Sequence, residues 1–207
     1  MATGFSYTYS KNKINIDSNA IDDTENSIHT KLKLRKSFSN RFKLNFGAEY
    51  FTTHFNEVFL NETISSLSYG FKNNILAAFA EADVIFSKQL ALKAGLRTEY
   101  SELFKEINVS PRISLAYKTG AKSQMSLAYG DFYQNPNSSV LKFEQNLKAQ
   151  QTQHYILNYQ YNNDGRIFRA ETYFKNYSKL VKYDTEFASF DTNFNRSCSC
   201  KRTCKRL

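Results

Sequence analysis

Tryptophan is absent from the chain of 207 residues, proline occurs twice and glycine seven times. So little glycine and proline excludes collagen-like and linker-like sequences. There is no run of about 18 apolar residues, which excludes a transmembrane helix. The hydrophobic content of 41% argues against global disorder. These absences do not exclude a transmembrane β-barrel, because its sequence pattern is an alternation of apolar and polar residues rather than a continuous apolar run.

Cysteine is also absent until the last segment of the chain, where Cys198, Cys200 and Cys204 lie in a basic tail. The whole chain carries 28 Lys+Arg against 19 Asp+Glu, a net charge of +9. Composition changes most sharply at the tail, so we predict two parts: a β-sheet domain over 1–190 and a Cys/Arg/Lys-rich tail over 191–207 that is non-native or disordered. Our hypothesis is an out-of-frame or truncated coding sequence joined near Asn195.

Two other interpretations of the tail are weaker. A metal site is disfavoured because Cys-x-Cys-x3-Cys supplies three ligands, no CxxC pair and no nearby histidine. A nucleic-acid-binding tail is possible from its charge. However, the remaining basic residues alternate with acidic ones, so we expect no nucleic-acid partner.

The start of the chain has no secretory signal peptide, which would need a basic start and an apolar stretch of about 7–15 residues. Instead, Phe5–Tyr9 already alternates like a strand. Either the protein is cytoplasmic, or this methionine is not the natural start of a longer exported chain.

The dominant pattern along the chain has period two, which predicts β-strands with one apolar and one charged face. Between Arg41 and Tyr50, for example, Phe42, Leu44 and Phe46 alternate with charged or small polar residues. The pattern over 74–86 also suits a helix, but its acids share one parity, which favours a strand. Nine such strands are predicted, over 5–9, 28–38, 41–50, 74–86, 90–100, 109–117, 125–133, 155–161 and 168–174.

The predicted connections alternate between short and long. Short turns are expected at Ser39-Asn40, 87–89, Gly120 and Asp164-Gly165, and long loops near 15–26, 54–72, 102–108 and 135–150. This arrangement is typical of outer-membrane barrels. The fold predicted is therefore all-β, an antiparallel up-and-down meander that forms a partial transmembrane β-barrel of about nine strands.

Aromatic residues of the apolar parity form two rows, as the two interfaces of a membrane select. The alternative is that aromatic residues simply favour strands. One row flanks the short turns and consists of Phe38, Phe42, Phe86, Tyr117, Tyr161 and Phe168. The other lies toward the long loops and consists of Tyr50, Tyr100, Tyr133 and Phe174. On the polar parity, Gly47, Gly95 and Gly130 predict either sheet curvature or room for something packed inside.

An ordered set of segments resembles the barrel of TonB-dependent outer-membrane receptors, particularly those of the Bacteroidetes type. These segments are Ala78–Asp83, Leu92–Tyr100, Ser110–Tyr117, Leu127–Gly130, Gln134–Pro136 and Glu171–Tyr177. The resemblance covers roughly residues 40–185 and identifies the chain as a fragment of the C-terminal β-barrel. It implies a complete barrel of about 22 strands with a plugged lumen.

The resemblance also implies function. The intact parent protein would sit in the cell outer membrane, surrounded by its lipid, and take up a siderophore, cobalamin, glycan or peptide. The inner-membrane TonB complex would energise uptake through an N-terminal plug region that this sequence does not contain. Such a receptor is a transporter rather than an enzyme, and it needs no cofactor.

Two sets of residues are candidates for the functional surface, and the sequence predicts no catalytic or metal-binding set. The predicted loop His54–Phe71 offers aromatic and acidic side chains for ligand contact, or it caps the barrel by packing on itself. Its candidates are Phe55, Glu57, Phe59, Glu62, Tyr69 and Phe71. The charged parity predicts a lumen-facing ladder of paired charges. Its members are Lys43, Glu49, Glu81, Asp83, Lys93, Arg97, Glu99, Arg112, Arg169 and Glu171.

Two alternatives to the receptor remain open at this point. One is a small complete outer-membrane barrel acting as a porin or adhesin. The other is a soluble β-barrel binding protein, in which the apolar face would point inward and the charged face outward.

Overall fold

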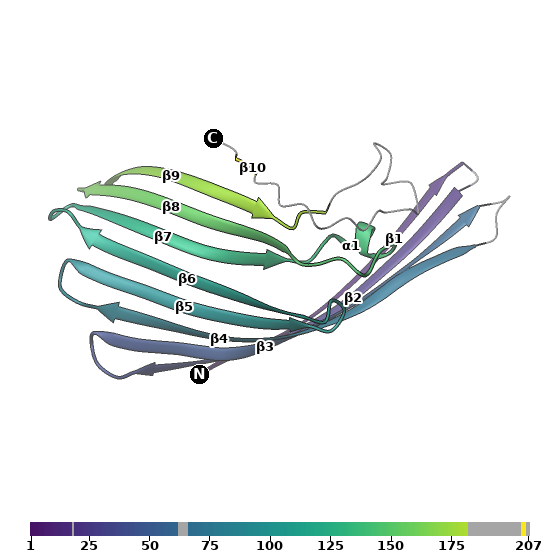
Figure 1. Ribbon diagram of the computed structural model, residues 1–207, viewed down its shortest axis with the longest axis horizontal. Coiled ribbons are helices and arrows are strands. Elements are labelled where there is room, and N and C mark those ends of the chain that lie inside the picture. The colour runs from purple at the N-terminus through teal and green to yellow at the C-terminus, as the bar shows by residue number, and fades with distance from the viewer. Residues whose placement is uncertain (18, 62–65, 182–203, 206–207) are drawn as a thin grey trace.

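The computed structural model describes residues 1–17, 19–61, 66–181 and 204–205, which form one antiparallel meander. Each strand pairs with the next in the chain (Figure 1). The elements are β1 (Ala2–Ile16), β2 (Asn19–Ser37), β3 (Phe42–Asn61), β4 (Leu67–Ile85), β5 (Leu90–Ser101), β6 (Glu106–Lys118), β7 (Ser123–Gln134), α1 (Ser138–Leu141), β8 (Gln150–Asn163), β9 (Arg166–Ser178) and β10 (Cys204–Lys205). The predicted all-β meander is confirmed.

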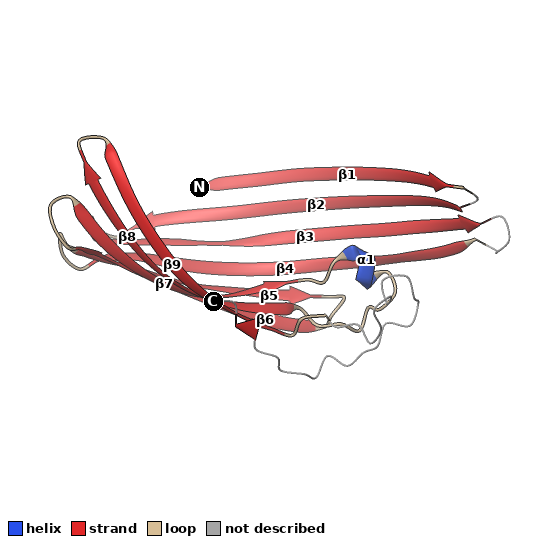
Figure 2. Ribbon diagram, turned by 90° about the horizontal axis from the view of Figure 1, so that it is seen from above, coloured by secondary structure: helices blue, strands red, loops and turns tan. Residues whose placement is uncertain are grey.

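The sheet is open. It curls into a trough whose rims are β1 on one side and β9 on the other (Figures 1 and 2). In the part of the chain that the structure describes, β1 pairs only with β2, and β9 pairs with β8 and with the two residues of β10. The architecture is therefore that of a partial barrel.

Four short turns join the strands at one end of the trough, where the sequence predicted them. At two of them a serine closes the turn: the Ser39 hydroxyl accepts from the backbone N–H of Phe42 at 3.0 Å, and the Ser87 hydroxyl from that of Leu90 at 3.1 Å. At a third, Asp164 and Gly165 both have positive φ, 47° and 80°. That conformation matches the Asp-Gly two-residue hairpin turn.

Two of the predicted long loops are strands instead. Residues 15–16 and 19–26 belong to β1 and β2, which pair up to Ile16 and Asn19, while Ser18 lies outside the described residues. Residues 54–72 belong largely to β3 and β4, which pair up to Phe59 and Leu67, while 62–65 lie outside the described residues. The prediction for 54–72 is wrong because the apolar alternation ends near Tyr50, whereas the strand continues to Asn61. Backbone pairing does not require an apolar face.

The two faces of the trough have opposite character. The outer face carries the apolar parity: Leu32, Phe46, Leu96 and Leu115 remain 37%, 38%, 48% and 39% exposed. The inner face carries the charged parity, and Glu49 on it is only 6% exposed. A soluble barrel has the reverse arrangement, so the sheet has the inverted polarity of a membrane barrel.

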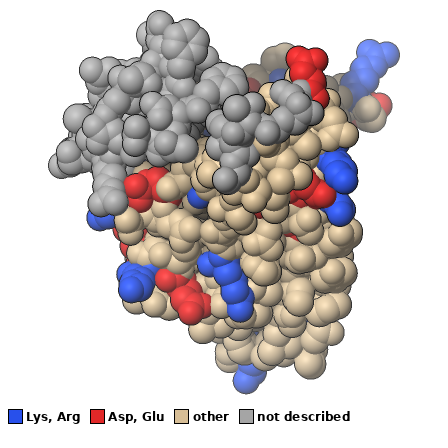
Figure 3. Space-filling view, turned by 90° about the vertical axis from the view of Figure 1, so that its right-hand side faces the viewer, with Lys and Arg blue, Asp and Glu red and all other residues tan. Residues whose placement is uncertain are grey.

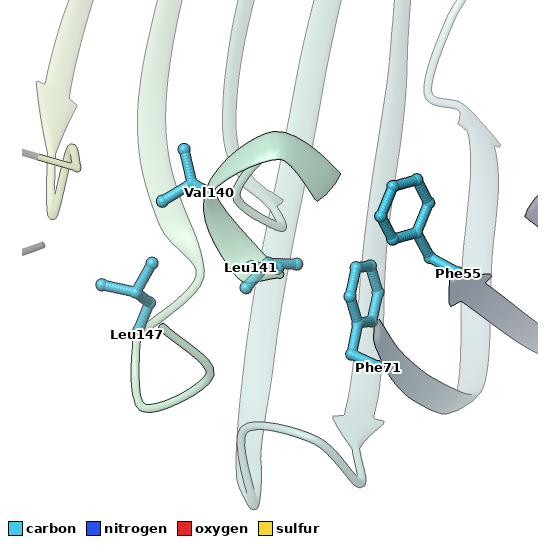
Figure 4. Close-up of a cluster of buried hydrophobic side chains, with 5 residues drawn as sticks. All are labelled: Phe55, Phe71, Val140, Leu141 and Leu147. Carbon is cyan, nitrogen blue, oxygen red and sulfur yellow. The ribbon is translucent and has the colours of Figure 1, made fainter. Parts of the chain in front are cut away.

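One hydrophobic cluster forms on the inner face, beyond the end of β5 and β6 (Figure 4). Two rings come from β3 and β4, and the others from the connection between β7 and β8, residues 135–149, here called the inward segment. The buried members are Phe55, Phe71, Val140, Leu141 and Leu147. The inward segment thus leaves the sheet, turns through α1 and packs on β3 and β4, with contacts that join residues 75 and 85 positions apart.

Candidate binding surface on the inner face

The most buried charge on the inner face is Glu49 of β3, which two cations share. Arg97 of β5 donates from Nη1 to its Oε2 at 2.6 Å, and the Lys31 ammonium of β2 contacts its other oxygen. Arg97 reaches across β4 because the residue beside Glu49 on that strand is Ala77, which is 1% exposed and has no side chain to block the path. Arg97 Nε also contacts Glu99 at 3.3 Å.

A second charged group lies nearer the short turns. Lys93 of β5 contacts Glu81 at 3.1 Å and Asp83 at 3.3 Å, both on β4. Lys43 stands opposite Asp83 in the register of β3 and β4. Across strands, opposite charges at such positions stabilise the pairing.

The remaining members of the predicted ladder have other contacts. Arg112 lies over the ring of Phe132, 4.6 Å from its centroid. Glu171 accepts from the Asn158 amide at 3.1 Å, and Arg169 stands opposite Gln160. The charge-pair ladder is therefore formed on β2–β5, whereas on β6–β9 the predicted charges meet aromatic and amide groups. Lys31, which takes part in the first group, was absent from the predicted set.

Two of the three inner-face glycines are covered by phenylalanine rings of the sheet itself. A Cβ on Gly47 would overlap the Leu32 carbonyl oxygen and come within 2.8 Å of the Phe79 ring. A Cβ on Gly130 would come within 2.9 Å of the Phe132 ring. At Gly95 the nearest atoms are at 3.4–3.5 Å, which is ordinary contact. Close packing against an aromatic ring thus explains Gly47 and Gly130.

Two open recesses meet at Gly95, between Glu81 of β4 and Arg112 of β6. The first, of about 160 Å³, extends toward Glu49 and Arg97, and the second, of about 190 Å³, toward Phe132 and His154. Together they present carboxylates, guanidinium groups and an aromatic face to the interior. Such a surface can bind a polar ligand that carries charge, through ion pairs and stacking.

The predicted ligand-binding residues lie on strands rather than on a loop. Phe55, Glu57 and Phe59 are on β3, and Tyr69 and Phe71 are on β4. Glu62 lies outside the described residues. The prediction of a loop here was wrong, for the reason given above for 54–72. Phe55 and Phe71, which face each other at 5.6 Å between ring centroids, are buried by the inward segment.

The inward segment is held to this strand pair by polar contacts as well. The Lys142 ammonium binds both oxygens of Glu57, at 2.6 and 2.7 Å, and their side chains are only 15% and 9% exposed. Gln145 donates to the Gly70 carbonyl at 3.0 Å. The Phe143 ring meets Tyr69 edge-on at 4.8 Å. Sequence reasoning missed Lys142 and its neighbours because the partners are 85 residues apart and no local pattern links them.

The described residues contain no helix long and apolar enough to cross a membrane. They also contain no group of three or more His, Cys, Asp or Glu side chains that could hold a metal ion. Of the three cysteines, Cys198 and Cys200 lie outside the described residues.

Comparisons of the sequence and of the structure with known proteins point to the same family. A family model described as "TonB dependent receptor-like, beta-barrel" matches residues 2–197. No curated protein matches the sequence.

Solved structures share the fold at low identity. The ferric enterobactin receptor of Pseudomonas aeruginosa is 16% identical with a TM-score of 0.62, over 77% of this chain and 28% of that one. The ferric yersiniabactin uptake receptor of Yersinia pestis is 12% identical with a TM-score of 0.63, over 86% and 33%. A copper transporter is 12% identical with a TM-score of 0.63, over 79% and 31%. The chain thus spans about a third or less of each of these proteins.

Proposed function

Because the chain belongs to the family of TonB-dependent receptor-like β-barrels, we propose that it forms part of the wall of an outer-membrane receptor that imports a scarce nutrient. The observation that carries this proposal is the inverted polarity of the trough. An exposed apolar outer face suits contact with lipid, and a charged inner face suits contact with a polar ligand and a polar plug domain. The TonB complex would energise transport through the rest of the receptor.

Within the nutrient classes, we propose a charged metal chelate. The inner recesses around Gly95 combine Arg97 and Arg112 with the Phe132 ring, a set that suits an anionic, partly aromatic ligand. The names of the structural relatives also support a metal chelate: two are receptors for ferric chelates and one transports copper.

Uptake by the organism that carries the gene tests both statements. Cells with the gene intact, disrupted and restored are given radioactive ferric enterobactin, a copper salt and cyanocobalamin in turn. We expect disruption to abolish energy-dependent uptake of one metal probe, with cyanocobalamin unaffected. Recovery of the protein in the soluble fraction would contradict the receptor, whereas loss of cyanocobalamin uptake alone would contradict the metal chelate.

A second experiment links uptake to the inner face. Replacing Arg112→Gln should weaken binding of the imported metal probe to outer membranes about ten-fold, since a charge-assisted contact contributes roughly 1.5–3 kcal/mol. The matched control is Arg169→Gln, on the same face but away from both recesses, which should leave binding unchanged.

A further inference from the structure

The net charge of the chain is concentrated in two places. The four short turns, taken together with the strand residues that flank them (36–41, 86–89, 118–122 and 163–166), hold six basic residues and one acid, Asp164, a net charge of 6 − 1 = +5. The tail over 191–207 holds five basic residues and one acid, 5 − 1 = +4. Because the whole chain has a net charge of +9, the remaining residues together carry no net charge. The turn cations are Lys36, Arg41, Lys88, Lys118, Lys122 and Arg166.

The up-and-down topology brings these four turns to one end of the trough (Figure 1). All six cations are exposed. The opposite end is different: Figure 3, seen from the side where β1–β4 project, shows basic and acidic side chains interspersed. The sheet therefore has one cationic end and one end of mixed charge.

The cations lie directly beside an exposed row of aromatic rings. Phe38 is 55% exposed, Phe86 54% and Phe168 60%, and each is in or next to a short turn. Lys36 Nζ lies 5.0 Å from the centroid of the Phe38 ring. Aromatic rings at the edge of an apolar band occupy the level of the lipid headgroups. A cation at the same level is in reach of headgroup phosphates.

We propose that the four short turns form a binding surface for anionic phospholipid headgroups, in the leaflet that surrounds this end of the barrel. Lys and Arg near an anionic membrane surface contribute about 1 kcal/mol each, or roughly five-fold in affinity. Because these cations are spread over four consecutive turns, they attach this end of the barrel to charged lipid. This surface rests on the membrane placement proposed above but not on the identity of the nutrient.

Two charge-matched variants of the full chain test the surface. One removes five turn cations and keeps Lys122, which contacts Asn163 and Asp164. The other removes five exposed cations at the opposite end. The turn variant carries Lys36→Gln, Arg41→Gln, Lys88→Gln, Lys118→Gln and Arg166→Gln. The control variant carries Lys11→Gln, Lys13→Gln, Lys72→Gln, Lys105→Gln and Lys148→Gln.

Each protein is diluted from urea into vesicles of phosphatidylcholine alone or with about one fifth phosphatidylglycerol, and the fraction that floats with the vesicles is measured at low and high salt. We expect the parent chain to prefer anionic vesicles at least ten-fold at low salt. The turn variant should lose most of that preference, and the control should keep it within about two-fold. The tail is the same in every protein, so it cannot produce a difference between the variants.

Three outcomes would overturn the proposal: equal loss in both variants, which indicates a net-charge effect, no loss in the turn variant, or a parent preference that persists at high salt. The neutral vesicles separate this proposal from the one before it. A chain that floats with neither kind of vesicle contradicts membrane placement itself, whereas one that floats equally with both contradicts only the headgroup surface.

Discussion

Strands β2–β4 and strands β5–β9 share the same alternation of apolar and polar residues but differ in length. The first group has 19, 20 and 19 residues, and the second has 12 to 14. In β3 the apolar outer face ends at Tyr50, nine residues into the strand, which is the length that spans a bilayer at about 45° of tilt. The remaining eleven residues project beyond it.

This difference separates two roles of one sheet. The shorter strands, and the matching part of the longer ones, form the apolar band. The projecting part of β3 and β4 is the platform on which the inward segment packs. The two regions should therefore respond to different substitutions. Three pairs of variants and one single variant test that expectation in the full chain folded in phosphatidylcholine vesicles.

The largest effect is expected at the ion pair on the platform. Lys142→Met leaves the nearly buried carboxylate of Glu57 without its cation, which costs about 3–5 kcal/mol locally. Hydrogen exchange should show loss of protection over 135–149, with β5 and β6 unchanged. Lys72→Met, an exposed position on β4, is the control and should leave exchange as it was. Uniform loss over the whole sheet would mean that the inward segment is not a separate unit.

In the band, a charge on the outer face should be costly. Leu96→Arg should lower the free energy of unfolding by about 2–4 kcal/mol, because the guanidinium would face hydrocarbon near mid-depth. Ser68→Arg, on the same face of the platform, should change it by no more than about 1 kcal/mol. Urea titration of both variants measures the contrast. Equal costs would place Ser68 inside the bilayer and erase the distinction between the two regions.

The inner face of the band offers a matched pair of glycines. Gly47→Ala should destabilise the sheet by about 1–3 kcal/mol, because the new methyl group overlaps a backbone oxygen that cannot move freely. Gly95→Ala should be within about 0.5 kcal/mol of the parent, since its neighbours lie at ordinary contact distance. A larger cost at Gly95 would show that its recess holds something the sheet itself does not provide.

The smallest effect is expected outside the band, at the exposed pair of Lys11 with Asp22, 3.6 Å apart. Lys11→Gln should change the free energy of unfolding by about 0–1 kcal/mol. Salt should reduce the difference further, because the pair is solvated and screened. A loss that high salt does not reduce would indicate that this part of β1 and β2 is less exposed to water than the structure indicates.

Much of the fold could be predicted because it follows from local patterns. Phe42, Leu44 and Phe46 determine which residues of β3 face outward. Asp164-Gly165 specifies the turn between β8 and β9 through a backbone conformation that few other pairs adopt. Lys93 with Glu81 and Asp83 could be predicted as well, since partners on adjacent strands follow from parity and register.

The platform could not be predicted in the same way. Beyond Tyr50 the outer face of β3 continues with Thr52, His54 and Asn56, so the alternation of apolar and polar residues no longer marks the strand, although its pairing with β2 and β4 continues. The inner partners of Phe55 and Glu57 come from a segment far along the chain. Only the three-dimensional packing brings Leu141 and Lys142 to them, and a single sequence carries no trace of that pairing.

The packing of the inward segment also bears on the order of events during biogenesis. Glu57 and Lys142 meet across 85 intervening positions, and three strands, β5–β7, lie between the platform and the inward segment. Contacts of such long range form late, because the loop between them must first be closed by structure. We therefore expect burial of Leu141 to follow the pairing of β3 through β7.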